Sequence, residues 1–364
     1  MSTESRTRKR WLGVACATAV MAAALAIAPA AASATAQVST TAQVSTTAQV
    51  SMPTQPSSNF VTHMLPANRT TSASADAEKF WTQERMKSAK SLDGSVAPGQ
   101  TPAPEQLKAA ANTVRPAGYV QQTLPPSEGF AAVGVSSTIG RVFFTDQSGA
   151  IDACSGGSIT SEAGDMVLTA GHCVFGGAGF VNNDPAVPRN WYTHWTYVPG
   201  YYVDAAGNAH APYGWWSQWG AVTTQAWVDT ADENLDMAIS CVSPNGISQA
   251  LTTVVGGQGL TIEPPLNQPT VAYGYPVNPS NPSAPVNVQT CSGRMGTYYH
   301  KQALMICNMG PGSSGGPWLI FQDAWGMGLA AGINRYWEPG LQIMDSPWFT
   351  ADNILPIYTY LRHW

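Results

Sequence analysis

Residues 312–317 read Gly-Ser-Ser-Gly-Gly-Pro, and they say more about this 364-residue chain than any other stretch. A serine held between glycines in a tight turn is how acyl-transfer enzymes present a nucleophile. Residues 169–173, about 140 positions upstream, read Thr-Ala-Gly-His-Cys. A serine needs a base to become nucleophilic near neutral pH, and histidine is the usual base. We therefore expect Ser314 and His172 to act together.

Catalysis by such a pair needs a third group that holds the imidazole in the correct tautomer and stabilises its charged form. Between His172 and Ser314 the best candidate is Asp236, which precedes an apolar run typical of a strand. Asp229 and Asp232 lie nearby, but an exposed turn would account for either of them. We predict that Asp236 orients His172.

These motifs resemble those of the trypsin- and chymotrypsin-like serine peptidases, with a GDSGGP-type nucleophile motif and a TAAHC- or TAGHC-type histidine motif. The order His, Asp, Ser is also that of this lineage. The resemblance covers roughly residues 133–364. It implies an all-β fold, a double six-stranded antiparallel β-barrel with a C-terminal helix. Periodicity alone predicts only a sandwich or barrel, with a helix at 351–361. The expected strands are residues 139–145, 158–160, 166–169, 235–242, 270–275 and 318–321.

The resemblance also implies the role of each catalytic group. Ser314 Oγ attacks the scissile carbonyl, His172 takes its proton, and Asp236 orients His172. The backbone N–H groups of Gly312 and Ser314 form the oxyanion hole. The expected function is that of a secreted serine endopeptidase working through an acyl-enzyme on protein or peptide substrates, as a monomer without a cofactor. The alternatives are a catalytically silent binder of peptides or polysaccharide with the same fold, and an ester hydrolase.

The chain departs from the digestive enzymes at Ser313, where they carry an aspartate that pairs with the newly freed N-terminus. Bacterial relatives of the glutamyl-endopeptidase type also lack this aspartate. Residues 139–144, Ile-Gly-Arg-Val-Phe-Phe, resemble the first strand of those relatives. The resemblance is therefore closest to that branch.

The substrate pocket is expected at Asn308, Met309 and Asn334. Glutamyl endopeptidases have a histidine where Asn334 stands and a threonine where Met309 stands. Trypsin-like enzymes have an aspartate at the position of Asn308. Because a buried charge without a partner is costly, a neutral pocket disfavours charged side chains. We expect preference for an uncharged or medium-sized apolar residue.

The N-terminus has the pattern of an export signal over residues 1–34. Arg6, Arg8, Lys9 and Arg10 precede an apolar run, and small residues follow it. The alternative is a membrane anchor, since the run is close to the ~18 residues that begin to span a bilayer. The alanine content and the small-residue exit favour cleavage, which predicts a secreted protein outside the membrane.

Residues 35–130 are expected to form a spacer and a pro-region ahead of a peptidase domain at 131–364. Three copies of a six-residue repeat, Thr-Ala-Gln-Val-Ser plus one further residue, predict a disordered spacer rather than a β-solenoid. A helix is expected over residues 74–92, followed by proline-rich chain. The first 130 residues carry a net charge of +4 and the remainder −9. The opposite signs favour docking of the pro-region on the rest of the chain before its removal.

Five cysteines remain after the signal. The resemblance implies a disulfide between Cys154 and Cys173, which flank the histidine turn. A second bridge between Cys291 and Cys307 is expected just before the nucleophile. Cys241 is left over, in an apolar strand where a buried thiol is more common than a reactive one. Disulfides agree with export to an oxidising compartment.

The interval between His172 and Asp236 is rich in tryptophan and tyrosine. These rings could form an exposed platform for peptides or sugars, or thicken the core, and we favour the core. The acidic balance of the peptidase domain argues against nucleic-acid binding. No metal-binding motif is present. Calcium at the acidic loop 229–236 is not required by anything in the sequence.

Overall fold

The computed structural model describes residues 59–91, 121–122, 135–176, 189–277, 284–296, 302–338 and 342–364. The expected signal peptide at 1–34 and the hexad spacer lie outside these residues, as does most of the chain from 92 to 134. The boundaries expected for the signal, the pro-region and the peptidase domain therefore stay predictions. No helix among the described residues is long and apolar enough to cross a membrane.

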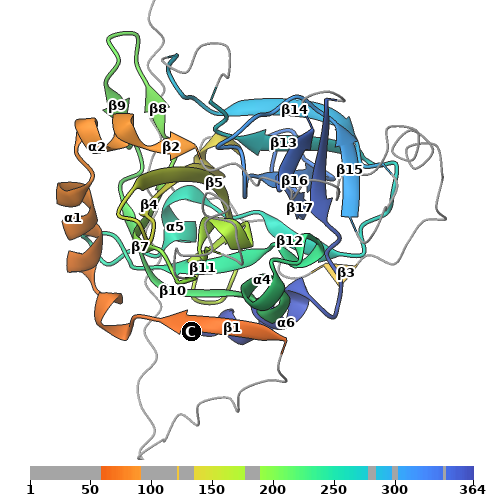
Figure 1. The fold of residues 1–364 in the computed structure, drawn as a ribbon, viewed down its shortest axis with the longest axis horizontal. Helices are drawn as coiled ribbons and strands as arrows, with labels where there is room; N and C mark the ends of the chain where they lie inside the picture. The colour runs from red at the N-terminus through yellow and green to blue at the C-terminus, as the bar shows by residue number, and fades with distance from the viewer. Residues whose placement is uncertain are drawn as a thin grey trace, which may run out of the picture. The chain divides into compact units, whose positions relative to one another are not determined.

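Six antiparallel strands close into a barrel in the first half (Figure 1). They run in the order β10-β11-β6-β5-β4-β7, and β7 pairs again with β10. Closure pairs the strand edges that an open sheet would expose. The residues of β4 and β5 are buried along nearly the whole length of each strand. The strands are β4 (Ile139–Thr145), β5 (Ile151–Ile159), β6 (Met166–Thr169), β7 (Thr193–Pro199), β10 (Trp216–Thr224) and β11 (Ala238–Val242).

The second half divides into two sheets within the described residues, rather than one continuous ring. The larger has the order β14-β13-β16-β17-β12-β3 and includes one parallel pair, β12 with β17. The smaller has the order β15-β19-β18. The strands are β3 (Gln121–Gln122), β12 (Gly259–Ile262), β13 (Pro269–Gly274), β14 (Gln289–Arg294), β15 (Gln302–Ile306), β16 (Pro317–Ile320), β17 (Leu329–Ile333), β18 (Tyr336–Glu338) and β19 (Ile343–Pro347).

Four of the six expected strands agree with the structure to within one residue, whereas the strand expected at 158–160 is the end of the longer β5 and that expected at 235–242 begins only at Ala238. The helix expected at residues 74–92 is broken into two. The first helix ends at Phe80 with Trp81 as its C-cap, and Thr82 caps the second helix, because its side chain accepts a hydrogen bond from Arg85 N (3.3 Å). The break turns Trp81 into the core, where it is 2% exposed. The N-terminal elements are β1 (Phe60–Met64), η1 (Pro66–Asn68), α1 (Thr71–Phe80), α2 (Gln83–Ser88) and β2 (Lys90–Ser91).

The C-terminal helix α6 (Ile354–Leu361) forms where it is expected. Asn353 caps it by accepting a hydrogen bond from Ile354 N, and its buried side chains recur at the spacing of one helical face. The remaining short elements are η2 (Val135–Thr138), η3 (Gly171–Cys173), β8 (Tyr202–Val203), β9 (Ala209–His210), α4 (Gln225–Thr230), η4 (Glu233–Leu235) and α5 (Leu251–Val255).

Two clusters of buried hydrophobic residues differ in composition, and the first contains residues of both halves. The first is rich in aromatic residues and includes Trp81 and Met86 of the N-terminal segment. The second is rich in methionine and is centred on Trp318. Most of the aromatic interval lies in the first cluster, as we favoured; Tyr202, which is 44% exposed, is an exception. The expected disulfides Cys154–Cys173 and Cys291–Cys307 are both present.

Candidate active site

His172 lies on a short turn at the end of β6, inside the described core. The 3₁₀ helix η3 carries it directly after Gly171. A Cβ on Gly171 would lie 2.9 Å from both Asp236 Oδ1 and Trp227 Cδ1. Glycine is therefore required for the close approach of the histidine turn to Asp236.

Two hydrogen bonds join His172 to Asp236. The carboxylate Oδ1 accepts from His172 N at 2.8 Å, and Oδ2 lies 2.7 Å from Nδ1 of the ring. Both residues are buried, and Asp236 comes between η4 and β11. A carboxylate that holds both the backbone and the ring fixes the orientation of the imidazole.

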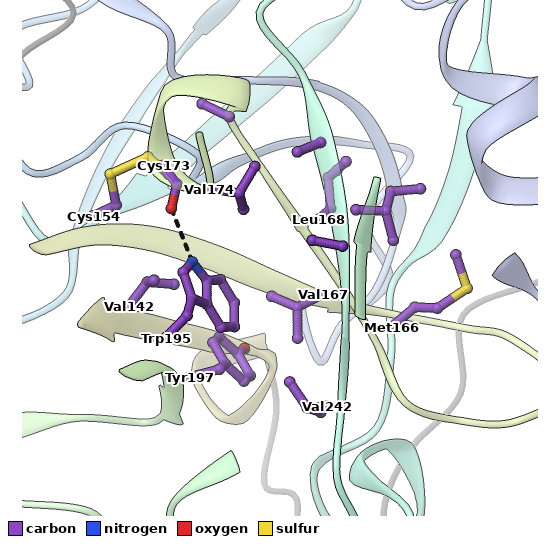
Figure 2. Close-up of a cluster of buried hydrophobic side chains, with 14 of the residues drawn as sticks. Val142, Cys154, Met166, Val167, Leu168, Cys173, Val174, Trp195, Tyr197 and Val242 are labelled. Carbon is purple, nitrogen blue, oxygen red and sulfur yellow. Dashed lines mark hydrogen bonds between the residues drawn. A yellow bond between two sulfur atoms is a disulfide. The ribbon is translucent and has the colours of Figure 1, made fainter. Parts of the chain in front are cut away.

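Two indole N–H groups donate hydrogen bonds to backbone carbonyls of the histidine turn. Trp195 Nε1 donates to Cys173 O at 2.8 Å, and Trp227 Nε1 donates to Phe175 O at 3.0 Å. Figure 2 shows the Trp195 indole beside the Cys154–Cys173 disulfide, with its nitrogen pointing to the Cys173 carbonyl oxygen. The aromatic interval therefore contributes to the site by holding the turn that carries His172.

The turn at residues 311–316, which carries Ser314 and is here called the nucleophile turn, packs directly against the histidine turn at residues 170–175. Gly315 has a φ of 82°, and a Cβ there would lie 2.2 Å from Thr169 Oγ1. Ser314 O accepts a hydrogen bond from Ser155 N at 2.8 Å and lies 3.6 Å from Cys173 Sγ. The structure thus brings Ser314 of the second half beside the disulfide that flanks His172.

Backbone carbonyls of the nucleophile turn are held by the surrounding protein. Pro311 O accepts from Val277 N at 2.8 Å, and Gly312 O accepts from Ser155 Oγ at 2.8 Å. Within the described residues, the N–H groups of Gly312 and Ser314 donate to no protein acceptor. The carbonyls of this turn are hydrogen-bonded, whereas these two N–H groups are available. They are therefore suited to donate hydrogen bonds to a negatively charged oxygen.

A buried ionic cluster lies between the aspartate loop and the second half. Arg335 contacts Asp345 through two hydrogen bonds and Glu233 Oε2 at 3.1 Å. Burial raises the pKa of both carboxyls, against the opposing effect of Arg335. Burial alone would lower the pKa of Arg335, but Asp345 and Glu233 raise it overall. The cluster ties η4, which precedes Asp236, to β19.

The three residues expected in the substrate pocket lie in different environments. Asn308 is exposed, and Met309 is buried in the methionine-rich cluster. Asn334 is fully buried and is hydrogen-bonded within the protein on every side that its amide offers. Their contribution to substrate selection stays a prediction.

Sequence reasoning singled out the candidate residues His172, Asp236 and Ser314 but missed Ser155, which contacts the Ser314 turn through both its backbone and its side chain. No local motif marks this serine, because its role depends on the meeting of β5 with a turn about 160 residues later. Cys241 is buried and unbonded as expected, and burial raises the pKa of its thiol.

One group of potential metal ligands lies at the site, made of Cys154, His172 and Cys173, whose ligand atoms are within 4.8 Å of one another. The two sulfurs are bonded to each other in a disulfide. They are therefore not available as thiolate ligands, and the group does not fit a metal.

Solved structures provide the comparison with known proteins. The thermostable serine protease AL20 from an extremophilic microorganism is 25% identical, covering 63% of this chain and 98% of its own, with a TM-score of 0.53. The protease Anisep from Arthrobacter nicotinovorans is 24% identical over 66% of this chain and 100% of its own, with a TM-score of 0.52. A Glu endopeptidase is 17% identical over 69% and 99%, with a TM-score of 0.49. No family model and no curated protein matches the chain.

Proposed function

Because the chain is a chymotrypsin-like serine peptidase in fold, we propose that it is a secreted, monomeric serine endopeptidase made as a precursor. The observation that supports this most is the buried pair of His172 and Asp236, joined by hydrogen bonds of 2.7 and 2.8 Å. It lies close to a serine turn in which the N–H groups of Gly312 and Ser314 donate to no acceptor among the described residues. A protein that only binds peptides has no use for this combination.

The proposed reaction has two halves. Ser314 Oγ bonds to the substrate carbonyl carbon while its proton moves to His172, and the carbonyl electron pair moves onto the oxygen. The N–H groups of Gly312 and Ser314 would hold that oxygen. The C–N bond then breaks, and the amine leaves with the proton from His172. Water repeats the attack on the acyl-enzyme, His172 accepts its proton and returns it to Ser314 Oγ as the acid is released.

A fluorophosphonate tests the nucleophile without knowledge of the substrate. We expect a single adduct on Ser314 in the processed protein, and none in His172→Ala. Ser314→Ala should abolish peptide cleavage. Absence of the adduct on folded, processed protein would favour a silent binding protein instead. Paired ester and amide substrates would then separate an ester hydrolase from a peptidase.

The precursor proposal is supported by the way residues 59–91 join the first half. Strand β1 pairs with β10 on the edge that β7 leaves free. Trp81 Nε1 donates to Thr196 Oγ1 at 2.9 Å inside the core. Gln83 exchanges two hydrogen bonds of 2.8 Å with the backbone of Ala209. A segment attached at so many points would assist folding of the catalytic unit.

The end of this segment reaches the nucleophile turn. Lys90 and Ser91 pair in parallel with Asp152 and Ala153 on an edge of β5. A Cβ on Gly312 would lie 2.5 Å from Ser91 Oγ. A free strand edge beside a nucleophile is where an extended peptide can add by β-pairing. We propose that Ser91 and Lys90 occupy this edge until the segment is removed.

The proposal that Lys90 and Ser91 occupy this edge is tested by the rate of fluorophosphonate labelling before and after processing. The full-length chain should react with the fluorophosphonate at least 10-fold more slowly than the processed enzyme. Peptide mass should find the mature N-terminus between about Arg115 and Ile139. Active enzyme that still carries residues near Gln37, labelled at the rate of the processed form, would contradict the precursor.

A further inference from the structure

The direction of the Ser314 N–H group is set by the peptide group that it shares with Ser313. In a trans peptide the carbonyl and the N–H point to opposite sides. Whatever holds the Ser313 carbonyl therefore also aims the Ser314 N–H. The Ser313 carbonyl accepts from Gly316 N at 3.0 Å and from Asn334 Nδ2 at 2.9 Å. The first bond belongs to the turn itself, and the second comes from a side chain 21 residues away.

Asn334 is held in one orientation by its other contacts. Its Oδ1 accepts from Trp318 Nε1 at 2.8 Å, and this indole has no proton acceptor to offer. The amide oxygen must therefore face Trp318, which directs Nδ2 to the two carbonyls on the other side. These are Ser313 O and Tyr273 O, the latter at 2.7 Å. Neither carbonyl could accept a hydrogen bond from an oxygen in this place.

The backbone of Asn334 is bonded to the same turn. Asn334 N donates to Gly316 O at 2.8 Å, and Gly315 N donates to Asn334 O at 2.7 Å. The amide fits because two glycines leave room for it. A Cβ on Gly316 would lie 2.8 Å from Nδ2, and one on Gly274 would lie 3.0 Å from it. The residue is fully buried, so water cannot replace these bonds.

We propose that Asn334 is a positioning residue that aims the Ser314 N–H at the developing oxyanion by holding the Ser313 carbonyl. This inference rests on the proposed function, and it adds a residue that acts through the turn without touching the substrate. Loss of an oxyanion donor costs about 10²–10³ in kcat. A donor that is present but poorly aimed should lose a part of this.

Asn334→Asp tests the proposal with almost no change in shape. The introduced carboxylate turns an oxygen toward two carbonyl oxygens, whereas the neutral acid can donate one hydrogen bond. Burial keeps the pKa of such a carboxyl high, so the neutral form returns as the pH falls. Asn353→Asp is the matched control, because Asn353 Nδ2 also donates to a backbone carbonyl, Trp348 O at 2.8 Å, outside the nucleophile turn. Processed enzyme of each variant is labelled with a fluorophosphonate over a pH series, with the melting temperature measured alongside.

At pH 8 we expect the maximal labelling rate of Asn334→Asp to fall at least 30-fold, with the inhibitor half-saturation concentration within 3-fold of the unsubstituted enzyme. The labelling rate of Asn334→Asp divided by that of the unsubstituted enzyme should rise at least 5-fold as the pH is lowered from 8 to 5.5. A loss no larger than that of Asn353→Asp, or a ratio that stays flat with pH, would overturn the proposal. If Asn334→Asp does not fold, Asn334→Ser is compared at pH 8 by the same rate and half-saturation criteria. Absence of labelling in the unsubstituted enzyme would contradict the proposed function instead.

Discussion

The two halves of the molecule hold the proposed catalytic groups by different means. His172 and Asp236 are supplied by the first half, where a closed barrel, a disulfide and buried indoles fix the chain. Ser314 is supplied by the second half, where polar side chains reach the carbonyls of its turn. In the first half a carboxylate, a disulfide and buried indoles hold the turn of His172 and its ring, whereas in the second half polar side chains hold the backbone carbonyls of the Ser314 turn. Substitutions should therefore cost mainly stability in the first half and mainly rate around the nucleophile turn.

Asp236→Asn is the largest exception that we expect to this division. The amide keeps the size of the carboxylate but favours the wrong tautomer of His172, so kcat should fall about 10⁴-fold. The melting temperature should change little, because the amide has the size of the carboxylate that it replaces. Single-turnover kinetics with a peptide substrate provide the measurement. A fall of less than 100-fold would indicate that another carboxylate, such as Asp232, orients the histidine.

Trp81→Ala tests whether a substitution in the core of the first half lowers the stability of the protein. The side chain is 2% exposed, and its removal from a core costs about 3–5 kcal/mol of unfolding free energy. Urea unfolding of the full-length chain in a Ser314→Ala background measures this loss without self-cleavage. Trp325→Ala is the control, because Trp325 is 62% exposed and should change stability by only about 0.5 kcal/mol. Equal effects of the two substitutions would show that the N-terminal segment is not part of the core.

Ser155→Ala should act mainly on rate, although Ser155 belongs to the first half. It removes two hydrogen bonds, from Ser155 Oγ to Gly312 O and from Tyr275 N to Ser155 Oγ, both 2.8 Å. We expect kcat to fall about 10- to 100-fold, with a loss of about 1–3 kcal/mol in stability. Ser158→Ala on the same strand is the control, since its Oγ donates to Gly256 O outside the turn. A similar loss of kcat in both variants would mean that Ser155 only stabilises the fold.

The smallest expected effect is the pH dependence of the N-terminal segment. His63 stacks on Trp191, and His194 stacks on Phe80 with Arg85 nearby. Burial lowers the pKa of both histidines, and Arg85 lowers that of His194 further. The state in which the segment is undocked therefore binds more protons at His63 and His194, and docking should weaken as the pH falls below about 6.5.

Limited proteolysis of the full-length chain between pH 8 and pH 5 measures this change. We expect cleavage within residues 59–91 to increase at the acidic end. His63→Phe together with His194→Phe keeps the ring contacts and should flatten the profile. A profile that is unchanged by this double substitution would assign the pH dependence to other groups.

Sequence patterns were sufficient where local chemistry decides the structure. Strand β4 begins and ends where its apolar run predicts, and the buried face of α6 follows from helical spacing. The sequence also singled out His172, Asp236 and Ser314, because a triad needs these residue types in short, recognisable turns. Their roles stay predictions until the reaction is measured.

Contacts between distant segments could not be predicted from the sequence. The helix expected at 74–92 is broken because Trp81 is more stable in the core than on a helix surface. The attachment of residues 59–91 depends on which strand edge the barrel leaves free. Nothing local indicates that Asn334 bonds to Ser313, since the neighbourhood arises only when β17 pairs with β16.

The disulfide between Cys154 and Cys173 has a consequence for the cell that makes the protein. The backbone carbonyl oxygen of Ser314 lies 3.6 Å from one of its sulfurs, so the Ser314 turn packs against a bond that does not exist when the chain is synthesised. Such bonds persist in oxidising compartments and are rare in the reducing cytoplasm. In the proposed secreted protein, the site would thus be completed only after export. The producing cell would be protected from digestion because the site is incomplete until the disulfide forms, whether or not an inhibitory segment covers it.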